Sequence, residues 1–372
     1  MLYPNRPKDP AILFEIRIRK KFNEMQDGVE ETIMQNPKCG DGDWFAAGMA
    51  AAQPRGAQTL EVSGLTVALP TEKGEIRPVS DVSLRVAPGE IVGIVGESGC
   101  GKSMTARAVM GLIPAPGRII AGSVRLAGRE IAGLSEREKR AIRGSEISMI
   151  FQEPMSSLNP VMKVGWQVAE ALRLHSDCTR EEARTRTLAA FREVEIPEPE
   201  ARLRQYPHQL SGGLRQRVMI AMAMICRPKL LIADEPTTAL DVTVEAQILR
   251  LLERLREGGT SILLISHNLG VIARVCDRVY VMYAGRILEE AETTVLFDQP
   301  LHPYSRGLLR ASLSLREGVE PLETIPGGVP NLLRLPAGCG FGPRCACRRS
   351  ECAAAMPELR VVEAGHRVRC FH

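Results

Sequence analysis

Apolar runs of strand length alternate with longer amphipathic stretches through the middle of the chain. The apolar runs lie at residues 60–67, 79–86, 90–95, 146–151, 230–233 and 262–265. Between the last two runs, apolar residues recur at the spacing of one helix face, at Val244, Ile248, Leu251, Leu252 and Leu255. Strands that alternate with helices in this way predict an α/β fold with a parallel sheet at its core.

The same pattern divides the chain into segments. A helix is expected over residues 102–112, directly after the strand at 90–95. Helical patterns then dominate residues 164–204, between turns marked by proline, which predicts an inserted helical subdomain at about residues 152–225. We therefore expect a main domain over residues 58–300. Residues 301–372 are rich in proline, glycine and cysteine and predict a C-terminal extension with a short helix near its start.

Residues 1–57 differ in composition from the rest of the chain. They contain one plausible helix, at residues 12–26, followed by polar and Gly/Ala/Pro-rich sequence without a repeating apolar face. We expect a poorly ordered extension. One hypothesis is that translation begins at Met49, and the alternative is a helical arm that contacts a partner.

Composition and charge narrow the function classes. The 48 basic and 44 acidic residues leave a net charge of +4, which provides no strong field for binding nucleic acid. No apolar run approaches the roughly 20 residues that span a bilayer, and no secretory signal is visible, so we expect the chain in the cytosol. In that reducing compartment, the 10 cysteines are expected to be metal ligands or buried apolar residues rather than disulfides.

The segment from Gly96 to Ser103 reads Gly-Glu-Ser-Gly-Cys-Gly-Lys-Ser and matches the phosphate-loop pattern G-x-x-x-x-G-K-[ST]. Such a loop surrounds phosphates with backbone N–H groups at the start of a helix. Lys102 is expected to reach the β- and γ-phosphates, and the Ser103 hydroxyl to bind Mg²⁺. The predicted nucleotide-binding residues of this segment are Gly96, Glu97, Ser98, Gly99, Cys100, Gly101, Lys102, Ser103 and Met104.

Two carboxylates end the apolar strand at residues 230–233. Asp234 is expected to hold the Mg²⁺ shell, and Glu235 to orient or deprotonate the attacking water, a role worth roughly 10²–10⁴-fold in rate. By itself, an acidic pair at a strand end is more often a solvated edge or a helix cap. Because a phosphate loop precedes this pair, the catalytic interpretation is favoured.

Residues 210–217, Leu-Ser-Gly-Gly-Leu-Arg-Gln-Arg, resemble the signature of ABC ATPases and precede the acidic strand at the spacing of that family. Gln152 (Q-loop), residues 239–241 (D-loop) and His267 (switch histidine) complete the family's motifs in order. The resemblance implies a P-loop NTPase fold of the ABC type, with an N-terminal antiparallel β subdomain added to the parallel core.

The resemblance also assigns roles to these residues. It implies a catalytic set of Lys102, Gln152, Glu235 and His267, in which Gln152 also contacts Mg²⁺. In the family two such domains dimerise head to tail, which implies that one chain completes the nucleotide site of its partner. The residues implied for that contribution are Ser211, Gly212, Gly213 and Asp241.

Residues 149–160 and 215–223, with His-Pro-Tyr-Ser at 302–305 and Ile-Pro-Gly-Gly-Val-Pro at 325–330, closely resemble the oligopeptide, dipeptide and nickel importer subfamily. This implies an ATPase at the cytoplasmic face of the inner membrane, paired with a second related ATPase, two permeases and an external solute-binding protein. Peptides are the expected cargo, and nickel or another small solute stays open.

Two other function classes are weighed against import. The first is an ABC ATPase that acts on DNA or ribosomes, and the second is a regulatory subunit that binds ATP without hydrolysing it. The first class carries long coiled coils, zinc modules or a second ATPase domain, none of which the sequence contains. Intact Lys102, Asp234, Glu235 and His267 argue against the second. No nucleic-acid partner is expected.

Two positions depart from the family pattern. Leu69 stands where many relatives place an aromatic ring that stacks on adenine. Such stacking is worth about 1–3 kcal/mol, so we expect ATP binding to be weaker by roughly ten- to hundredfold unless another ring substitutes. Leu214 replaces the polar or methionine residue that is usual at the fifth position of the signature.

Cys339, Cys345, Cys352 and Cys370 offer four thiolates in a glycine- and proline-rich segment that is too short to build much core of its own. Their spacing lacks the C-x₂-C pairs of common zinc sites, whereas four cysteine ligands suit an iron–sulfur cluster. The resemblance to peptide-importer ATPases likewise implies a [4Fe–4S] cluster here. Zinc, with His366 or Cys347 as a substitute ligand, is the alternative, and free surface thiols are the least favoured.

Overall fold

The computed structural model describes residues 58–152, 157–238, 240–317 and 324–372. The helix expected at residues 12–26 and the start proposed at Met49 lie outside the described residues. Among the residues that are described, none of the helices has the length and apolar character needed to cross a membrane.

A four-stranded antiparallel sheet contains the first strands, in the order β2-β1-β4-β5. Its strands are β1 (Leu60–Thr71), β2 (Gly74–Val86), β4 (Arg118–Leu126) and β5 (Arg129–Glu130). β1 and β2 extend beyond the apolar runs because they form a hairpin whose polar ends still pair, Thr71 with Gly74. The predicted N-terminal antiparallel sheet is confirmed.

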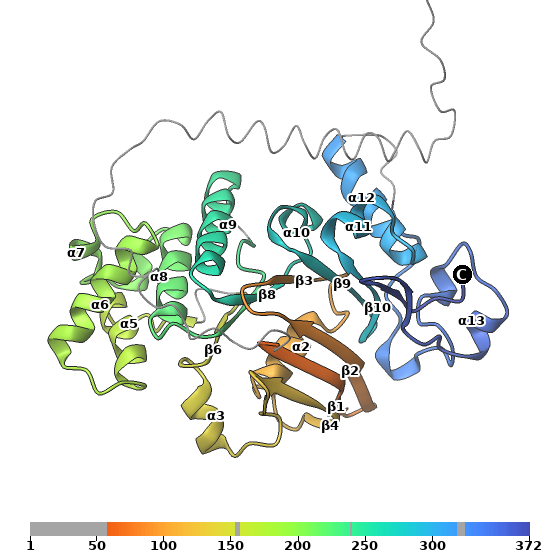
Figure 1. The fold of residues 1–372 in the computed structure, drawn as a ribbon, viewed down its shortest axis with the longest axis horizontal. Coiled ribbons are helices and arrows are strands. Elements are labelled where there is room, and N and C mark those ends of the chain that lie inside the picture. Colours follow the sequence, from red (N-terminus) through yellow and green to blue (C-terminus); the bar gives the residue numbers. More distant parts are fainter. Residues whose placement is uncertain (1–57, 153–156, 239, 318–323) are drawn as a thin grey trace, which may run out of the picture.

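The second sheet has eight strands in the order β11-β12-β10-β9-β3-β8-β7-β6 (Figure 1). Its strands are β3 (Ile91–Val95), β6 (Ile147–Ile150), β7 (Leu230–Asp234), β8 (Ser261–Ile265), β9 (Arg278–Tyr283), β10 (Arg286–Glu292), β11 (Arg360–Glu363) and β12 (His366–Val368). The neighbours from β6 to β9 pair in parallel, which confirms the predicted parallel core. Every residue of β3, β6, β7 and β8 is buried, as the continuous apolar runs indicate.

Two apolar cores cover the two faces of this sheet. Along β7, Leu230 and Ile232 face one core, and Leu231 and Ala233 face the other, as the twofold alternation of a strand requires. The first core also holds α2 (Lys102–Val109), which lies between the two sheets (Figure 1). The second holds α9 (Val242–Glu257) and α10 (Leu269–Val275).

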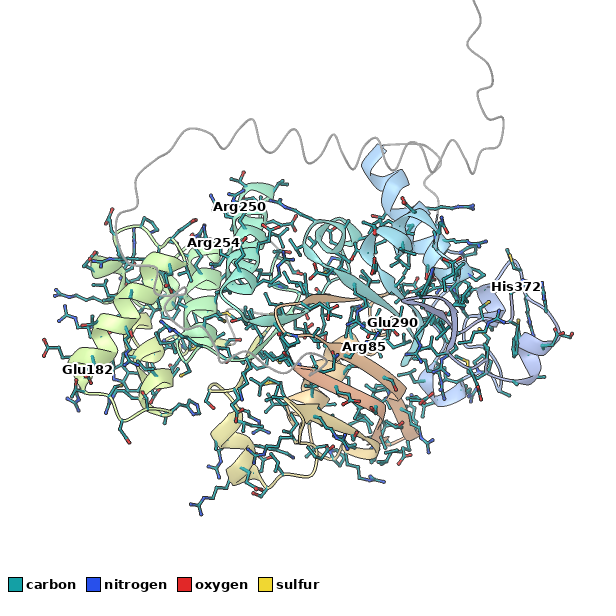
Figure 2. The ribbon with its side chains drawn as sticks, viewed as in Figure 1. Arg85, Glu182, Arg250, Arg254, Glu290 and His372 are labelled. Carbon is teal, nitrogen blue, oxygen red and sulfur yellow. The ribbon has the colours of Figure 1, made fainter. Side chains whose placement is uncertain are left out.

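A group of helices lies beside the β6 end of the sheet, at the left of Figure 1. These helices are α5 (Val164–Arg173), α6 (Arg180–Glu193), α7 (Pro199–Arg202) and α8 (Gly212–Met224). Two arginines fasten the group to α9. Arg254, which Figure 2 shows on α9, donates to Glu195 after α6 at 2.7 Å. Arg217 on α8 donates to Gln247 on α9 at 2.7 Å.

The remaining helices are short or lie near the end of the chain. They are α3 (Glu136–Ile142), α11 (Thr293–Asp298), α12 (Pro303–Glu317) and α13 (Glu351–Ala354). A 3-10 turn, η3, spans Gly342–Arg344. α12 covers the short helix expected at the start of the C-terminal extension and continues further.

The C-terminal extension is joined to the main sheet rather than set apart from it. β12 pairs with β10 in antiparallel fashion. Beside this junction lies Glu289, which is fully buried. Its carboxylate accepts hydrogen bonds from the backbone N–H groups of Leu301 (2.7 Å) and His302 (2.9 Å), and His366 Nε2 lies 2.8 Å from it. The extension therefore shares both strand pairing and a buried polar centre with the main domain.

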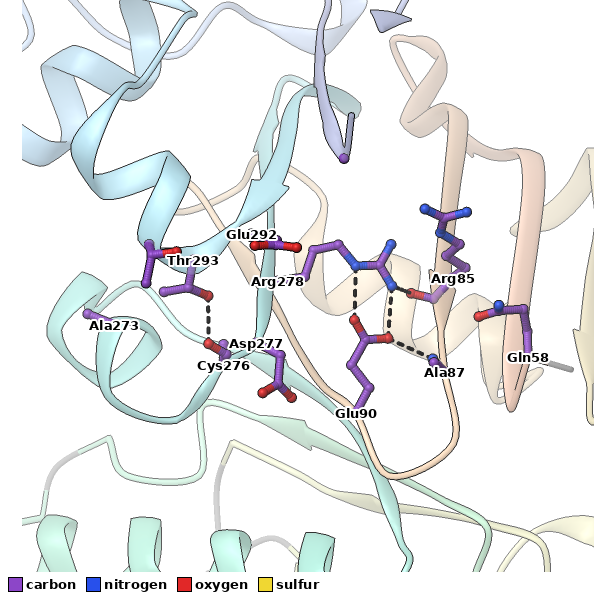
Figure 3. A pocket seen from close by; sticks show the side chains of 12 residues that line it. Gln58, Arg85, Ala87, Glu90, Ala273, Cys276, Asp277, Arg278, Glu292 and Thr293 are labelled. Atoms are coloured by element: carbon purple, nitrogen blue, oxygen red, sulfur yellow. Dashed lines mark hydrogen bonds and ion pairs between the residues drawn. The ribbon is translucent and has the colours of Figure 1, made fainter. Parts of the chain in front are cut away.

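A charged pocket lies where the central strands β3 and β9 begin, at the opposite ends of these strands from the phosphate loop. Figure 3 shows Arg278 in this pocket, where it donates to both carboxylate oxygens of Glu90 (3.0 and 2.8 Å) and to the backbone carbonyl of Arg85 (3.1 Å). Arg278 also donates to Glu290 at 3.0 Å. The charges that line this pocket are thus largely paired with one another, and they tie β9 and β10 to the turn before β3.

Candidate nucleotide-binding site

The phosphate loop connects β3 to α2, as the sequence predicts, and two of its glycines have no substitute. Gly96 has φ 154°, and a Cβ there would lie 2.1 Å from the carbonyl oxygen of Met282. Gly101 has φ 110°, and its Cβ would lie 2.2 Å from the carbonyl oxygen of Pro78. Any side chain at either position would displace backbone, so the motif's glycines are fixed by close packing.

Lys102 is 5% exposed and folds back over this loop. Its Nζ donates to the backbone carbonyls of Gly96 (2.8 Å) and Glu97 (3.1 Å). A buried ammonium group with only neutral acceptors is poorly compensated. The start of α2 adds the positive end of a helix dipole to the same place. The loop therefore fits an anionic phosphate group.

The next residue, Ser103, meets the acidic strand. Its hydroxyl donates to Oδ1 of Asp234 at 2.9 Å, and Asp234 is 3% exposed. Burial raises the pKa of Asp234; the bond from Ser103 opposes this effect, while neighbouring Glu235 adds to it. A hydroxyl and a carboxylate side by side are the oxygen ligands that Mg²⁺ prefers, so these residues fit the predicted ion.

Glu235 lies at the centre of a second cluster. Its carboxylate accepts hydrogen bonds from Gln152 Nε2 (2.9 Å) and Thr238 Oγ1 (3.0 Å), and His267 Nδ1 lies 3.2 Å away. Three of the four predicted catalytic residues therefore meet here, next to Asp234. Sequence analysis missed Thr238, although its position three residues after Glu235 in a turn is a local signal.

The backbone of Glu235 adopts an uncommon conformation. Its φ is 50°, in the left-handed region that L side chains rarely adopt, and its N–H donates to the carbonyl of Ile265 at 2.9 Å. Such a conformation costs about 1–3 kcal/mol and tends to occur at functional sites. Here it turns the chain at the end of β7, where the carboxylate meets Gln152 and His267.

The structure does not bring every predicted nucleotide-binding residue to the phosphate loop. Ser211 caps α8 by accepting from the N–H of Leu214 (3.3 Å), and Asp241 caps α9 by accepting from the N–H of Val244 (2.9 Å). The two helix starts adjoin, since a Cβ on Gly213 would lie 2.9 Å from the side chain of Val244. Within the described part of the chain, no hydrogen bond or ion pair joins Ser211 or Asp241 to the phosphate loop. Leu69 of β1 pairs with Ile76 of β2, and its place beside the adenine ring stays a prediction.

Comparison with protein families and curated relatives identifies the chain. The family described as "ABC transporter" matches residues 79–238, and "Oligopeptide/dipeptide transporter, C-terminal region" matches residues 288–352. The oligopeptide transport ATP-binding protein OppD of Salmonella typhimurium is 53% identical over 314 residues, covering 84% of this chain and 93% of that protein. OppD of Escherichia coli is 51% identical over 321 residues, covering 86% and 95%. The chain belongs to the oligopeptide and dipeptide branch of the ABC transporter family.

Solved structures support the same fold for this ABC ATPase. The post-hydrolysis dimer of the ATP-binding cassette MJ0796 with ADP and Pi matches with a TM-score of 0.58 and 28% identity, over 63% of this chain and 98% of that one. A second dimeric structure of MJ0796, titled a bacterial ABC transporter cassette, matches with a TM-score of 0.57 and 29% identity, over the same shares.

The four cysteines of the extension lie near one another in this ABC ATPase. The backbone N–H of Cys339 donates to the carbonyl of Cys352 at 2.8 Å. Burial raises the pKa of Cys339, and the nearby thiols of Cys352 and Cys370 contribute to the rise. Burial likewise raises the pKa of Cys345, with a contribution from Cys339. Among the described residues, however, no three or more His, Cys, Asp or Glu side chains are arranged to hold a metal ion.

Two further residues touch the phosphate loop of the ABC ATPase, and sequence analysis missed both. Tyr304 accepts a hydrogen bond from the N–H of Glu97 at 2.9 Å, and Arg344 pairs with the Glu97 carboxylate. Arg344 is 247 residues from Glu97, so no local pattern indicates the contact. The only signal for Tyr304 is its place in the His-Pro-Tyr-Ser motif of the subfamily.

Proposed function

We propose that this chain is the ATP-hydrolysing subunit of an importer that carries peptides across the cytoplasmic membrane. The observation that carries the proposal is Glu235, held between Gln152 and His267 beside the phosphate loop. The relatives are named for oligopeptide transport, which supports peptides as the cargo. Nickel or another small solute is the alternative cargo.

The site residues take the following roles. The backbone of residues 96–104 and the Lys102 ammonium bind the β- and γ-phosphates of ATP. Ser103, Asp234 and Gln152 are the residues that would hold Mg²⁺, which neutralises charge on the phosphate oxygens when bound. Glu235 accepts a proton from the attacking water or orients it, and His267 helps to position that water near the γ-phosphate.

A second, related ATPase subunit completes each nucleotide site. Ser211, Gly212, Gly213 and Asp241 would contribute to the site on the partner's phosphate loop. The two solved MJ0796 structures compared above are described as dimers, which supports such an arrangement. ATP held between two subunits favours the closed pair, and hydrolysis removes that preference, so a local change of charge can drive a large motion.

The other partners follow from the subfamily. We place the chain peripherally on the cytoplasmic face of the inner membrane, with two permease subunits and an extracytoplasmic solute-binding protein. Residues 58–300 form the ATPase domain, with its helical subdomain at about 152–225 beside the permeases. Residues 301–372 form the C-terminal extension, and residues 1–57 precede the ATPase domain.

Replacing Glu235 with glutamine tests the proposed role of this chain in ATP hydrolysis and import. In transporters assembled by co-expression with the permeases and second ATPase, Glu235→Gln should lower ATP hydrolysis and labelled-peptide uptake by roughly 10²–10⁴-fold and leave ATP binding in place. Glu257→Gln, at the end of α9, is the matched control and should leave both rates unchanged. An unaltered hydrolysis rate in Glu235→Gln would exclude Glu235 as the base. Uptake of nickel but not of peptide would show that nickel, the alternative, is the cargo.

We further propose that Cys339, Cys345, Cys352 and Cys370 hold a [4Fe–4S] cluster. Zinc, with Cys347 as a substitute ligand, is the alternative; His366 suits that role less well because it is committed to Glu289. Protein purified without oxygen should contain iron and sulfide in equal amounts and absorb visible light, and Cys352→Ser should remove both properties. Cys178→Ser, outside the extension, is the control. Zinc in place of iron selects the alternative, and absence of both metals contradicts a metal site.

A further inference from the structure

Glu97, the second residue of the phosphate loop, is held from the far end of the chain. Its backbone N–H donates to the hydroxyl of Tyr304 in α12 at 2.9 Å. Its carboxylate accepts two hydrogen bonds from Arg344 in η3, at 2.6 and 3.0 Å. Its backbone carbonyl bonds within the loop, where it accepts from Lys102 Nζ at 3.1 Å and from the N–H of Cys100 at 3.3 Å. The C-terminal extension thus holds two of the three polar groups of this residue.

Every N–H group of the Arg344 side chain donates a hydrogen bond. One Nη donates to Glu97 and to the hydroxyl of Tyr283 at 3.3 Å, and the other donates to Glu97 and to the carbonyl of Ile325 at 3.1 Å. Nε donates to the carbonyl of Pro326 at 2.8 Å. All five N–H donors of the guanidinium group therefore have partners, and its side chain is 6% exposed. A paired, bidentate arginine of this kind has little freedom to move.

Aromatic rings frame the same contact. The guanidinium carbon lies 5.8 Å from the ring centre of Tyr283 and 5.9 Å from that of Phe341. Tyr304 packs edge-on against Tyr283, with ring centres 4.7 Å apart, and lies 5.3 Å from Phe341. The three rings, from β9, α12 and the residue before η3, thus pack against one another beside the contact between Arg344 and Glu97.

The negative charge of Glu97 opposes the binding of phosphate by the loop. The loop attracts phosphate through N–H groups, a helix dipole and Lys102, whereas a carboxylate in the same loop repels phosphate. The Glu97 side chain is only 27% exposed, so water screens its charge incompletely. The buried guanidinium of Arg344 supplies the compensating charge at hydrogen-bonding distance.

We propose that Arg344 is a positioning residue of the phosphate loop: it neutralises and holds Glu97, and the C-terminal extension thereby sets the affinity of the loop for ATP. The proposal rests on the proposed function, because it takes ATP as the ligand of the loop. It assigns a role to the His-Pro-Tyr-Ser and Ile-Pro-Gly-Gly-Val-Pro motifs, which carry Tyr304 and the carbonyls that hold Arg344.

The test measures the dissociation constant for ATP, with Mg²⁺, on the full-length chain. Arg344→Met leaves the Glu97 carboxylate uncompensated, so ATP should bind roughly tenfold more weakly. Arg344→Met combined with Glu97→Gln removes the repelling charge as well, and should return the affinity to within about threefold of the native chain. Arg348→Met removes an exposed arginine from the same segment and should have no effect.

The double variant separates charge compensation from a purely structural role. A structural role would lower the melting temperature of Arg344→Met and leave the loss of affinity unrepaired in the double variant, which would overturn the proposal. If Arg344→Met does not fold, Glu97→Gln alone decides. It keeps Arg344, so it should bind ATP at least as tightly as the native chain, and weaker binding would contradict the proposal. A native chain that binds no ATP would instead reject the proposed function.

Discussion

At the scale of single residues, Glu289 combines complete burial with a charge. Burial by itself raises the pKa of its carboxyl, but hydrogen bonds from His366 and from the N–H groups of Leu301 and His302 lower it more, so the net shift is downward. A carboxyl whose pKa is lower in the folded than in the unfolded chain stabilises the fold above its unfolded pKa. That stabilisation is lost as the pH falls through the folded pKa.

Glu289→Gln should therefore destabilise the chain at neutral pH by about 1–3 kcal/mol, because buried donors lose a charged acceptor. The difference between native and variant chains should shrink as the pH falls below about 4.5, the unfolded value. Urea unfolding at pH 7 and at a series of acidic pH values measures both effects. Glu292→Gln, at the exposed end of the same strand, is the control. A difference that stays constant into acid would show that the charge of Glu289 is not involved.

The residues around the phosphate loop differ in whether a short sequence motif predicts them. Lys102, Ser103, Asp234 and Glu235 could be predicted because each lies in a short motif whose spacing follows from the chemistry of phosphate and Mg²⁺. Arg344 could not, because its contact with Glu97 depends on how the extension folds back over β9. The sequence around Arg344 contains no local pattern that indicates a contact with residue 97.

At the scale of elements, the sequence predicted β3, β6, β7 and β8 but missed β9, although every residue of β9 is buried. β3, β7 and β8 have continuous apolar runs because both of their faces are covered. β11 is exposed along its whole length, Val361 and Val362 included, so no buried face marks it as a strand, and β12 is only three residues long. α3 buries only Ile142, and its sole sequence signal is the capping box formed by Ser135 and Glu138.

At the scale of the whole molecule, the residues of the proposed nucleotide site lie in two separate parts of the chain. The phosphate loop and Glu235 lie at the ends of the central strands, whereas Ser211 lies at the start of α8 in the helical group. This separation has a physical reason in the proposed dimer, where the start of α8 faces another subunit. The motif order in the sequence could predict the parts but not their distance within one chain.

Ser211→Arg should accordingly leave ATP binding by the isolated chain unchanged, because among the described residues no hydrogen bond links Ser211 to its own phosphate loop. In the assembled transporter the same change should lower ATP hydrolysis by at least about tenfold, since it places bulk where the partner's phosphates would lie. Equilibrium ATP binding and a hydrolysis assay measure the two effects. Thr185→Arg, on an exposed part of α6, should alter neither. Weaker ATP binding by the isolated Ser211→Arg chain would argue against a divided site.

The central position of β3 affects how the chain reaches its native state. β3 pairs with β8 on one side, where Ile91 meets Ile262, and with β9 on the other, where Val92 meets Arg278. The middle of the sheet therefore cannot close until segments far apart along the chain have met, and non-local pairing of this kind makes folding slow. Until then the fully apolar strands stay exposed to other chains, so folding competes with aggregation and benefits from chaperones.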